Sequence, residues 1–498
     1  MITPPLMSPK EDAVALNAKA PGETAPPRKQ IPGGYNLPPG LKHSLPFYAH
    51  KRWVKLGEPI RLFEHLKRTY GTISKYRFLG TYIVFVNDPR YIREILITQG
   101  SSFVKERTLQ RMKILLGEGL ITSDDPIHMR HRKMMAPAFH RQRVMGYADA
   151  IVGITSSNVS PWKAGDVVDA NATMMVLSLE IIARTLFDTE VTDQVRGIND
   201  DTNAIMRLYN FLVAFPKLEQ FLHLPIPGVI QFRRSLARLD AVVDAMVRTR
   251  RDEMANGQGQ DRGDLLSLLV ASRYEAEAGD QPGAAPLGMT DRQIRDEVLT
   301  IFLAGYETVA NALTWTWYLL SQNPEVEARM HRELDEVLGV GHDRKLPTLE
   351  SYGALRYTEQ VFAEAMRLYP PAWAMGRKST ETVTLGEYTI PPGAHFFFSQ
   401  YVMHRSPEYF PDPLRFDPER FSPENKADRE KFTYFPFGGG GRQCIGESFA
   451  WMEGVLVLAT IGQRWRLRFV GEAVPVPQAR ITLRPRGAVR MQLEARRC

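Results

Sequence analysis

The sequence predicts a mainly α-helical protein with a small β subdomain. Four long segments carry apolar residues at three- and four-residue spacing, which is typical of helices that bury one face: 126–139, 165–187, 228–254 and 290–322. Residues 72–86 differ, because two runs rich in β-branched and aromatic residues flank Gly80, as in two strands joined by a turn. We expect strands near 382–400 to join this pair.

The N-terminal residues 1–40 are rich in Pro, Ala and Lys and end in Leu-Pro-Pro-Gly, so we expect a flexible leader. The remainder, 41–498, shows no internal repeat and no second domain signature, which predicts a single domain. The leader lacks the apolar segment of a signal peptide, and no run approaches the ~18–20 apolar residues that span a bilayer. These observations predict a cytoplasmic protein without a transmembrane anchor.

The second half of the chain continues the helical pattern after an irregular segment. Residues 255–290 are rich in Gly, Asp and Ala around one short helix near 264–272. Further helices are expected near 325–338 and 355–369. A stretch rich in Pro, Phe and Arg then runs from 404 to 436 without regular periodicity, and a loop of that length in a compact chain is usually functional or wraps another group.

Charge and cysteine content narrow the function classes. The net charge of +7 is small for 498 residues, and basic residues cluster at 130–133 and 464–468. These clusters indicate solvated faces or a surface for an acidic protein partner, and nucleic acid is disfavoured because no recognition module accompanies the charge. The two cysteines, Cys444 and Cys498, favour a reducing compartment over a disulfide-stapled secreted protein.

Cys444 lies in the most informative stretch of the sequence, residues 436–446, which contains four consecutive glycines, Gly438–Gly441. Glycine allows a backbone to approach another group closely. An apolar helix is expected over 445–464. That helix would place Cys444 at its N-terminus, where the helix dipole lowers the pKa of a thiol. A thiolate at such a position is a metal ligand or a nucleophile.

Several kinds of site are compatible with a cysteine beside glycines. A phosphate-binding loop would need Lys after Gly446, where Glu447 stands instead and would repel phosphate. A zinc site would need further ligands, and no CxxC pair is present. A cysteine hydrolase would need a paired histidine, which sequence alone does not locate. From these residues alone, the interpretation that Cys444 is a buried, inert cysteine also stays open.

The complete loop motif decides among these alternatives. The pattern F-x-x-G-x-R-x-C-x-G is met at Phe437, Gly440, Arg442, Cys444 and Gly446. It resembles the haem-ligand signature of the cytochrome P450 family, and five fixed residues within ten positions make the signature specific. The resemblance spans roughly residues 40–498.

Other motifs of the same family occur in the expected order. The family's A-G-x-[ED]-T is matched by Ala304-Gly305-Tyr306-Glu307-Thr308 in the middle of the longest expected helix, its E-x-x-R by Glu364 to Arg367, and its F-x-P-x-R by Phe416 to Arg420. One motif departs from the pattern. The family's W-x-x-x-R keeps its arginine at Arg132, but His128 stands in place of the tryptophan.

The resemblance implies haem b, a mainly α fold, and a haem that lies between the long central helix and the helix after the cysteine loop. It implies Cys444 as the iron ligand, Phe437 packed against its sulfur, and Gly438 in the ligand loop. The haem propionates would be held by Arg132, Arg377, Arg442 and His128, with His404 as a weaker candidate.

On the opposite side of the haem, the resemblance implies that Ala304 and Gly305 leave room for dioxygen. Thr308 would hydrogen-bond the oxygen and Glu307 would relay protons. A buried charge triad that locks the long loop is implied for Glu364, Arg367 and Arg420. The substrate pocket is expected to be lined by 107–120, 208–224, 302–308 and 372–375, whose residues suit an apolar molecule.

The implied activity is a monooxygenase reaction, in which one atom of O₂ enters an apolar substrate by hydroxylation or epoxidation. Only 52 residues follow Gly446, so we expect electrons from a separate ferredoxin or flavodoxin with its NAD(P)H-dependent reductase, docking near 130–143. Two alternatives are a peroxide-dependent peroxygenase or isomerase, against which the Glu307 and Thr308 pair argues, and a non-catalytic haem sensor.

Overall fold

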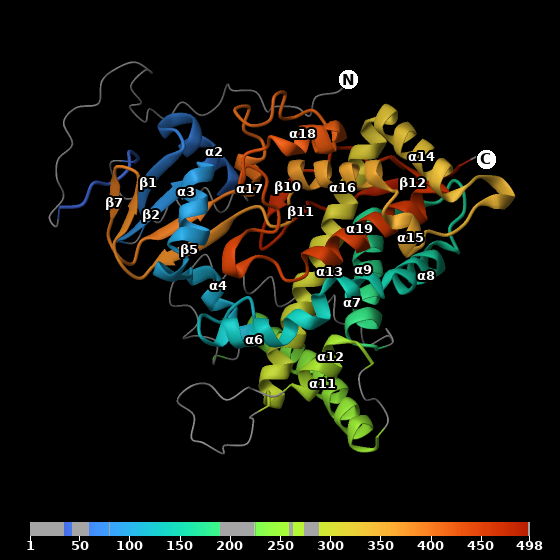
Figure 1. Cartoon of the computed structure of the whole chain (residues 1–498), viewed down its shortest axis with the longest axis horizontal. Helices are drawn as coiled ribbons and strands as arrows, with labels where there is room; N and C mark the ends of the chain where they lie inside the picture. The colour runs from blue at the N-terminus through green and yellow to red at the C-terminus, as the bar shows by residue number, and fades with distance from the viewer. Residues whose placement is uncertain are drawn as a thin grey trace.

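The computed structural model describes residues 34–41, 59–78, 80–189, 224, 226–257, 262–272 and 288–496. Within this part of the chain the longest helix is α13 (Asp291–Gln322), which runs through the middle of the molecule (Figure 1). Thr290 and Gln293 form a capping box at its start, and this box satisfies two free backbone N–H groups. Most of the helix is buried, including Trp315 and Trp317.

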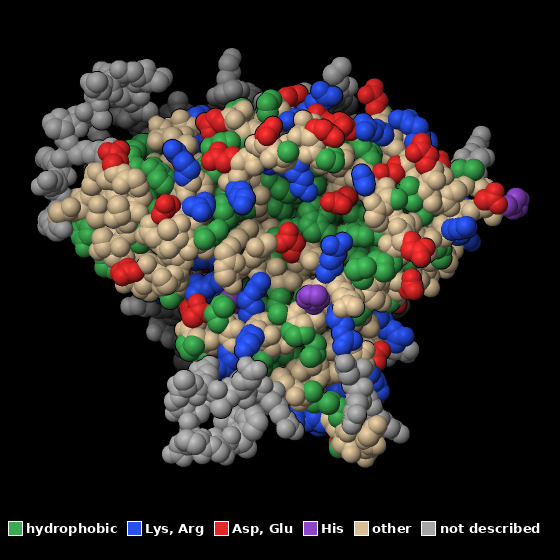
Figure 2. All heavy atoms as spheres, in the orientation of Figure 1, with side chains coloured by type: hydrophobic (Ala, Val, Ile, Leu, Met, Phe, Trp, Pro, Cys, Tyr) green, Lys and Arg blue, Asp and Glu red, His purple; other side chains and the backbone are tan. Residues whose placement is uncertain are grey.

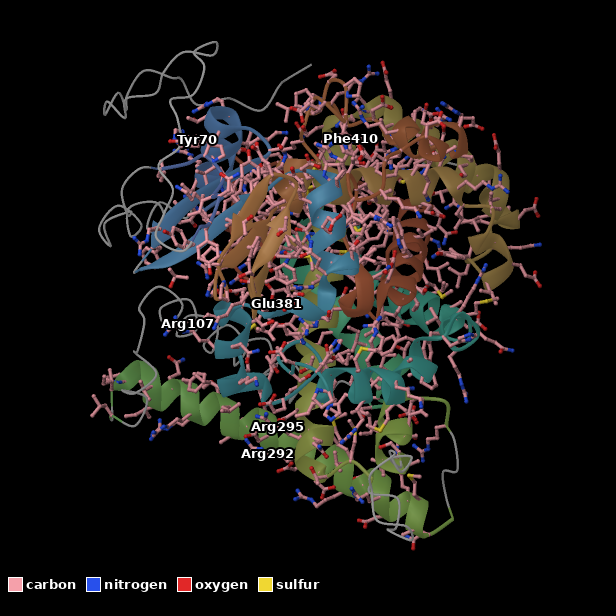
Figure 3. The ribbon with its side chains drawn as sticks, turned by 60° about the vertical axis from the view of Figure 1, so that its left-hand side comes forward. Tyr70, Arg107, Arg292, Arg295, Glu381 and Phe410 are labelled. Atoms are coloured by element: carbon pink, nitrogen blue, oxygen red, sulfur yellow. The ribbon has the colours of Figure 1, made fainter. Side chains whose placement is uncertain are left out.

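The helices that surround α13 bury their apolar faces against it. Helix α9 (Ala170–Leu186) packs along it, and α11 (Pro227–Ala255) crosses one end. Figure 3 shows Arg295 of α13 beside α11, where its Nε donates to Asp240 Oδ1 at 2.7 Å. Helices α16 (Arg356–Leu368) and α19 (Glu447–Gly462) pack on the other half, and α19 is buried on all sides from Met452 to its end.

Shorter helices complete the α-helical part. They are α2 (Pro59–Tyr70), α3 (Pro89–Arg93), α4 (Arg107–Arg111), α5 (Lys113–Leu116), α6 (Ile127–Met135), α7 (Arg141–Met145), α8 (Ala148–Val159), α12 (Leu265–Ala271), α14 (Pro324–Leu338), α15 (Leu349–Tyr352), α17 (Gln400–Met403) and α18 (Pro423–Ala427).

The β subdomain is a five-stranded sheet that lies beside the helices (Figure 1). In order across the sheet, its strands are β1 (Ile73–Phe78), β2 (Thr81–Val86), β8 (His395–Phe398), β5 (Met375–Ser379) and β3 (Phe103–Lys105). The β2–β8 pair is parallel and the other pairs are antiparallel. In the β3–β5 register Lys105 lies directly opposite Arg377.

Three smaller sheets are formed largely by the C-terminal segment. Strand β12 (Arg490–Ala495) pairs with both β4 (Val167–Asp169) and β9 (Trp465–Phe469). The two others are hairpins: β6 (Val383–Leu385) with β7 (Tyr388–Ile390), and β10 (Pro477–Ala479) with β11 (Leu483–Pro485). The β10–β11 hairpin packs against α13.

Most of the expected elements are confirmed, with four corrections. Of the strands expected near 382–400 to join β1 and β2, only β8 does so, because β6 and β7 pair with each other in a separate hairpin. The helix expected from 165 begins only at Ala170, because the preceding residues form β4. The helix expected from 445 begins at Glu447. The expected end of the flexible leader at residue 40 lies too late in the sequence, because the Leu37 side chain is buried and Gly40 pairs with β1.

The long segment 404–436 is irregular, as expected, apart from α18 and a 3₁₀ turn at Pro418–Phe421. Part of the irregular segment 255–290 and almost all of the pocket segment 208–224 lie outside the described residues. Among the described helices, none combines the length and the apolar character needed to cross a lipid bilayer.

Candidate functional site

Cys444 lies three residues before α19, in a loop that is closed by a 3.0 Å hydrogen bond from its own N–H to Phe437 O. Its side chain keeps accessible surface. The surrounding protein nevertheless raises the pKa of the thiol to about 11, chiefly by burial, against a smaller opposite effect of a hydrogen bond from the Gly446 backbone. The expected lowering of this pKa is therefore wrong, because burial outweighs the Gly446 hydrogen bond and the charge of Arg132, and the charge of Glu447 adds to the rise. A metal would have to displace the thiol proton on binding.

The glycines of this loop are required by neighbouring protein. Gly438 and Gly440 have φ of +74° and +72°, a conformation that L-residues with side chains rarely adopt. A Cβ on Gly440 would lie 2.0 Å from Leu96 O, and one on Gly438 would lie 2.9 Å from Met375 Cε. These contacts explain why both positions are glycine. The expected reason, a close approach of the backbone to a ligand, is not needed.

Two further predicted residues fix the loop in place. The ring of Phe437 packs on Trp451 of α19, with centroids 5.8 Å apart. Arg132 of α6 donates from Nη1 to Gln443 O at 2.7 Å, and its charge opposes the rise in the pKa of Cys444. Arg132 therefore holds the backbone directly beside the thiol.

A cluster of buried cations lies between the β subdomain and this loop. Lys105 and Arg377 are each 5% exposed and stand opposite each other on β3 and β5. Burial, then the charge of Arg442, lowers the pKa of Lys105 to about 7 and that of Arg377 to about 10. Like charges directly opposite in a sheet are destabilising, so this arrangement favours an anionic ligand.

Arg442 and His128 belong to the same cluster. Arg442 forms ion pairs with Asp124 at 3.4 Å and Asp125 at 3.2 Å, which offset part of the positive charge. His128 is buried, and its Nδ1 lies 3.3 Å from Asp125 Oδ1. Burial, then the charge of Lys105, lowers the pKa of His128 to about 4. This histidine is therefore neutral at pH 7 and can act as a hydrogen-bond donor without adding charge.

These residues fit haem, which carries two carboxylates at one edge and an iron that takes a thiolate. Arg377, Arg442, His128 and Arg132 were expected near the propionates, and the structure brings the first three together around Lys105. Lys105 was missed by the sequence reasoning. Its two hydrogen bonds, to Leu120 O at 2.6 Å and to Ser123 O, leave one of its three N–H donors for a ligand. The register with Arg377 that identifies it is not visible in the sequence.

The middle of α13 has one partly accessible face in an otherwise buried helix. Ala304, Gly305 and Thr308 are half-buried, whereas the residues from Val309 to Leu320 are buried. The hydroxyl of Thr308 donates within the helix, to Ala304 O at 2.8 Å and Gly305 O at 3.1 Å. Its lone pairs stay available to accept a hydrogen bond.

Gly305 has a packing function that the sequence did not reveal. A Cβ at this position would lie 2.3 Å from Ile182 Cδ1 of α9. The missing side chain therefore points toward the neighbouring helix, and it allows α9 and α13 to pack closely. The expectation that Gly305 makes room for dioxygen is not needed to explain this residue.

Glu307 is 9% exposed and lies on a different side of α13 from Thr308. Its Oε1 accepts a short hydrogen bond from the hydroxyl of Thr482, which lies between β10 and β11. Thr308, expected to hydrogen-bond the oxygen, and Glu307, expected to relay protons, therefore have separate partners in this structure.

The predicted charge triad is present as a buried cluster. Arg367 Nε and Nη2 donate to the two oxygens of Glu364 at 2.6 and 2.7 Å, and Arg420 Nε lies 3.5 Å from Glu364 Oε1. Arg367 also donates to the carbonyls of residues 404, 413 and 415. The triad thus fastens α16 to the long segment 404–436.

His404 belongs to this structural region and lies apart from the cation cluster. Its Nε2 accepts a 3.1 Å hydrogen bond from Phe435 N, and its ring packs on Tyr434 and Phe435. Burial lowers its pKa well below the usual value. The expectation that His404 contacts a propionate is therefore wrong.

Known proteins resemble this chain in both sequence and fold. Cyclooctat-9-en-7-ol 5-monooxygenase of Streptomyces melanosporofaciens is 33% identical over 459 residues, which are 91% of this chain and 92% of that protein. Cyclooctatin synthase of the same organism is 36% identical over 413 residues, 82% and 85% of the two chains. Pentalenene oxygenase of Streptomyces avermitilis is 33% identical over 457 residues, 91% and 96% of the two chains.

The fold is that of a solved haem domain, the crystal structure of the cytochrome P450DA heme domain. The two share a TM-score of 0.79 at 24% identity, with 93% of this chain and 98% of that chain covered. The family model described as Cytochrome P450 matches residues 38–489, and this range includes the thiol of Cys444, the buried cations and the open face of α13. The chain therefore belongs to the cytochrome P450 family and is a haem-dependent monooxygenase.

Proposed function

We propose that this monooxygenase binds haem b and hydroxylates or epoxidises an apolar terpenoid with electrons from a separate protein. The observation that carries the reaction is the accessible thiol of Cys444 in a loop that Arg132 holds from α6. When bound, haem would supply the activation of O₂ and the transfer of one oxygen atom to the substrate. Lys105, Arg377 and Arg442 would hold its propionates.

The substrate class rests on the relatives and on the apolar side chains near α13. The names of two relatives specify oxygenation of pentalenene and of cyclooctat-9-en-7-ol. In this chain the facing sides of α11 and α13 just before Ala304 are apolar and enclose a gap about the size of one water molecule. The gap is lined by Leu239, Val242, Val243, Met246, Leu299, Phe302 and Leu303. A substrate bound here would have to displace these side chains, and their apolar surfaces favour a hydrocarbon skeleton with few polar groups.

Protons for the reaction are proposed to come through the two predicted residues of α13. Thr308 has free lone pairs toward the accessible face of the helix and would accept or order a water there. Glu307 would exchange protons with water on its own side of the helix, because a carboxylate can accept and return a proton.

The electron donor is proposed to be an acidic ferredoxin or flavodoxin, reduced by an NAD(P)H-dependent reductase. Lys133 of α6 and Arg141 and Arg143 of α7 are exposed beside the loop of Cys444. Figure 2 shows Lys and Arg side chains around the middle of this face, with hydrophobic side chains between them. Complementary charge of this kind steers association and weakens with salt.

The reaction is tested first by the spectrum of the dithionite-reduced, carbon-monoxide-treated protein. We expect a band near ~450 nm, the signature of thiolate-ligated haem, which Cys444→Ala loses and Cys498→Ser keeps. Pentalenene and related terpenes are then screened by the Soret spin shift and by product analysis with a surrogate ferredoxin, its reductase and NADPH. Turnover with hydrogen peroxide alone would favour the peroxygenase, and ligand binding without oxygen consumption would favour a sensor.

The donor surface is tested by charge reversal. Lys133→Glu or Arg141→Glu should raise the KM for the ferredoxin several-fold at low salt and leave the carbon-monoxide spectrum unchanged. Arg332→Glu, on the exposed face of α14, is the matched control. Equal effects of all three variants would contradict docking at α6 and α7.

A further inference from the structure

The β10–β11 hairpin contacts the carboxylate proposed as proton carrier. Thr482, which is 6% exposed, donates its hydroxyl proton to Glu307 Oε1. The hairpin also brings the positive charge of Arg480 near Glu307, with the charge of the adjacent Arg484 beside it. Glu307 is thereby held toward the hairpin, on a different side of α13 from the Thr308 hydroxyl.

The position of Thr482 is fixed by two hydrogen bonds of the next residue, Leu483. Leu483 N donates to Pro371 O at 2.9 Å. Leu483 O accepts a 3.3 Å hydrogen bond from Trp315 Nε1, a buried side chain of α13 itself. The same helix that carries Glu307 therefore also anchors the residue that binds it.

A chain of side-chain hydrogen bonds continues from Thr482 to α9. Which atom donates in each bond can be derived from the end at α9. The Thr314 hydroxyl donates to Ala310 O at 2.7 Å, so its single proton is used and its oxygen can only accept. Asn171 of α9 lies with its Nδ2 3.4 Å from that oxygen and 3.1 Å from Asn311 Oδ1. Asn171 must therefore present its NH₂ group toward α13.

The remaining bonds follow from that orientation. Because Asn311 accepts with Oδ1, it turns its NH₂ group to Thr482 Oγ1 at 3.2 Å. Thr482 thus accepts from Asn311, and its one proton is left for Glu307. The hydrogen bonds all run the same way, from Asn171 to Asn311 to Thr482 to Glu307, and each amide orientation is set by its neighbour.

We propose that Thr482 is a positioning residue for Glu307, and that Asn311 and Asn171 fix the direction in which its hydroxyl donates. The line of bonds turns the carboxylate toward the hairpin and keeps it in one place from which it exchanges protons with water at α13. The inference rests on the proposed function of Glu307 and adds the residues that set its geometry.

Three variants separate the effects of the Thr482 hydroxyl, of the direction in which it donates, and of the packing of its methyl group. Thr482→Val removes the hydroxyl at nearly constant volume, and Thr482→Ser keeps the hydroxyl but loses a methyl group. Asn311→Asp keeps the shape of the line but offers Thr482 only oxygen acceptors, so the hydroxyl can turn away from Glu307. If one of the first two variants fails to fold, Asn311→Asp still tests the direction of the bond.

The experiment combines crystal structures of the haem-loaded variants with the hydrogen peroxide released per NADPH consumed. Pentalenene, a surrogate ferredoxin and its reductase are present in the second assay. We expect Glu307 to contact residue 482 in the wild type and in Thr482→Ser, and to move in Thr482→Val and Asn311→Asp. Peroxide per NADPH should rise two- to fivefold in the latter two, with the carbon-monoxide spectrum unchanged.

Other outcomes are equally decisive. If Glu307 keeps its position in Thr482→Val and Asn311→Asp, the positioning inference is wrong. If Thr482→Ser releases as much peroxide as Thr482→Val, the residue acts by packing and the inference also fails. If Glu307 moves but peroxide does not rise, the positioning stands and the proposed proton-carrying function of Glu307 is overturned.

Discussion

Gly305 offers a test of whether the middle of α13 is shaped by a neighbouring helix or by a ligand. A Cβ at this position would lie 2.3 Å from Ile182 Cδ1, whereas carbon atoms in contact normally lie about 3.5–4.0 Å apart. Gly305→Ala therefore requires a movement of about 1 Å in Ile182, a fully buried residue of α9. Overpacking of this kind costs about 1–3 kcal/mol.

The net effect of the substitution also includes helix propensity. Alanine is favoured over glycine by about 1 kcal/mol in a helix interior, so we expect Gly305→Ala to lower the free energy of unfolding by up to about 2 kcal/mol. Gly153→Ala in α8 is the matched control, because a Cβ at Gly153 meets no atom within 4 Å. That control should gain about 0.5–1 kcal/mol.

The decisive variant is Gly305→Ala combined with Ile182→Val. The single Ile182→Val change removes Cδ1 and costs about 0.5–1.5 kcal/mol. In the double variant the new Cβ fills the space that Cδ1 left, so the two changes should compensate by about 1–2 kcal/mol. Urea unfolding followed by circular dichroism gives the free energy of unfolding of the wild type, the two single variants and the double variant. If the unfolding free energies of the two single variants simply add in the double variant, the packing argument is refuted. If Gly305→Ala loses carbon monoxide binding and the added Ile182→Val change does not restore it, Gly305 faces a ligand.

Three further predictions address charge. Arg367→Met should destabilise the protein by about 3–5 kcal/mol, because it leaves Glu364 buried without its main partner; a melting temperature unchanged from the wild type would contradict this. Lys105→Met should weaken haem binding to the apoprotein about 10- to 100-fold, as expected for one charge-assisted hydrogen bond worth about 1.5–3 kcal/mol, whereas the exposed Lys378→Met should not. His331 is buried, and burial lowers its pKa to about 3. Protons then bind the unfolded state below pH 6.5, and stability falls by about 2 kcal/mol between pH 7 and pH 5; His331→Leu should lose that part of the pH dependence in urea titrations.

The helices could be predicted because their signals are local. The helix expected over 290–322 is α13 almost to the residue, since apolar spacing and the Thr290 cap lie within its own sequence. Strands β4 and β12 were missed for the opposite reason. Strand β4 (Val167–Asp169) is stabilised by pairing with β12, more than three hundred residues away, and its three residues carry no periodic pattern. A strand of that length is formed by its partner.

Residues of the candidate site could be predicted where a motif contains them. The prediction failed where the function depends on which way a side chain points or on what surrounds it. Cys444 and the Glu364 triad were expected from their motifs. The sequence did not show that burial raises the pKa of Cys444, because a pKa depends on the side chains around the group. Nor did it show that the missing side chain of Gly305 points at Ile182, or that Thr482 reaches Glu307, since these contacts join distant segments.

Two buried charged clusters in this protein show how a structural cluster differs from a binding site. Arg367 uses all five of its N–H donors on protein oxygens, two of them on Glu364, so nothing is left for a ligand. Arg377 is almost as deeply buried, yet among the described residues its guanidinium makes one hydrogen bond, to Gly376 O at 2.9 Å, and the residue stands opposite Lys105. A buried arginine with unused donors beside a second cation is costly unless an anion completes it. The excess of positive charge, more than the burial itself, is therefore our reason for proposing that the haem propionates bind at Lys105 and Arg377.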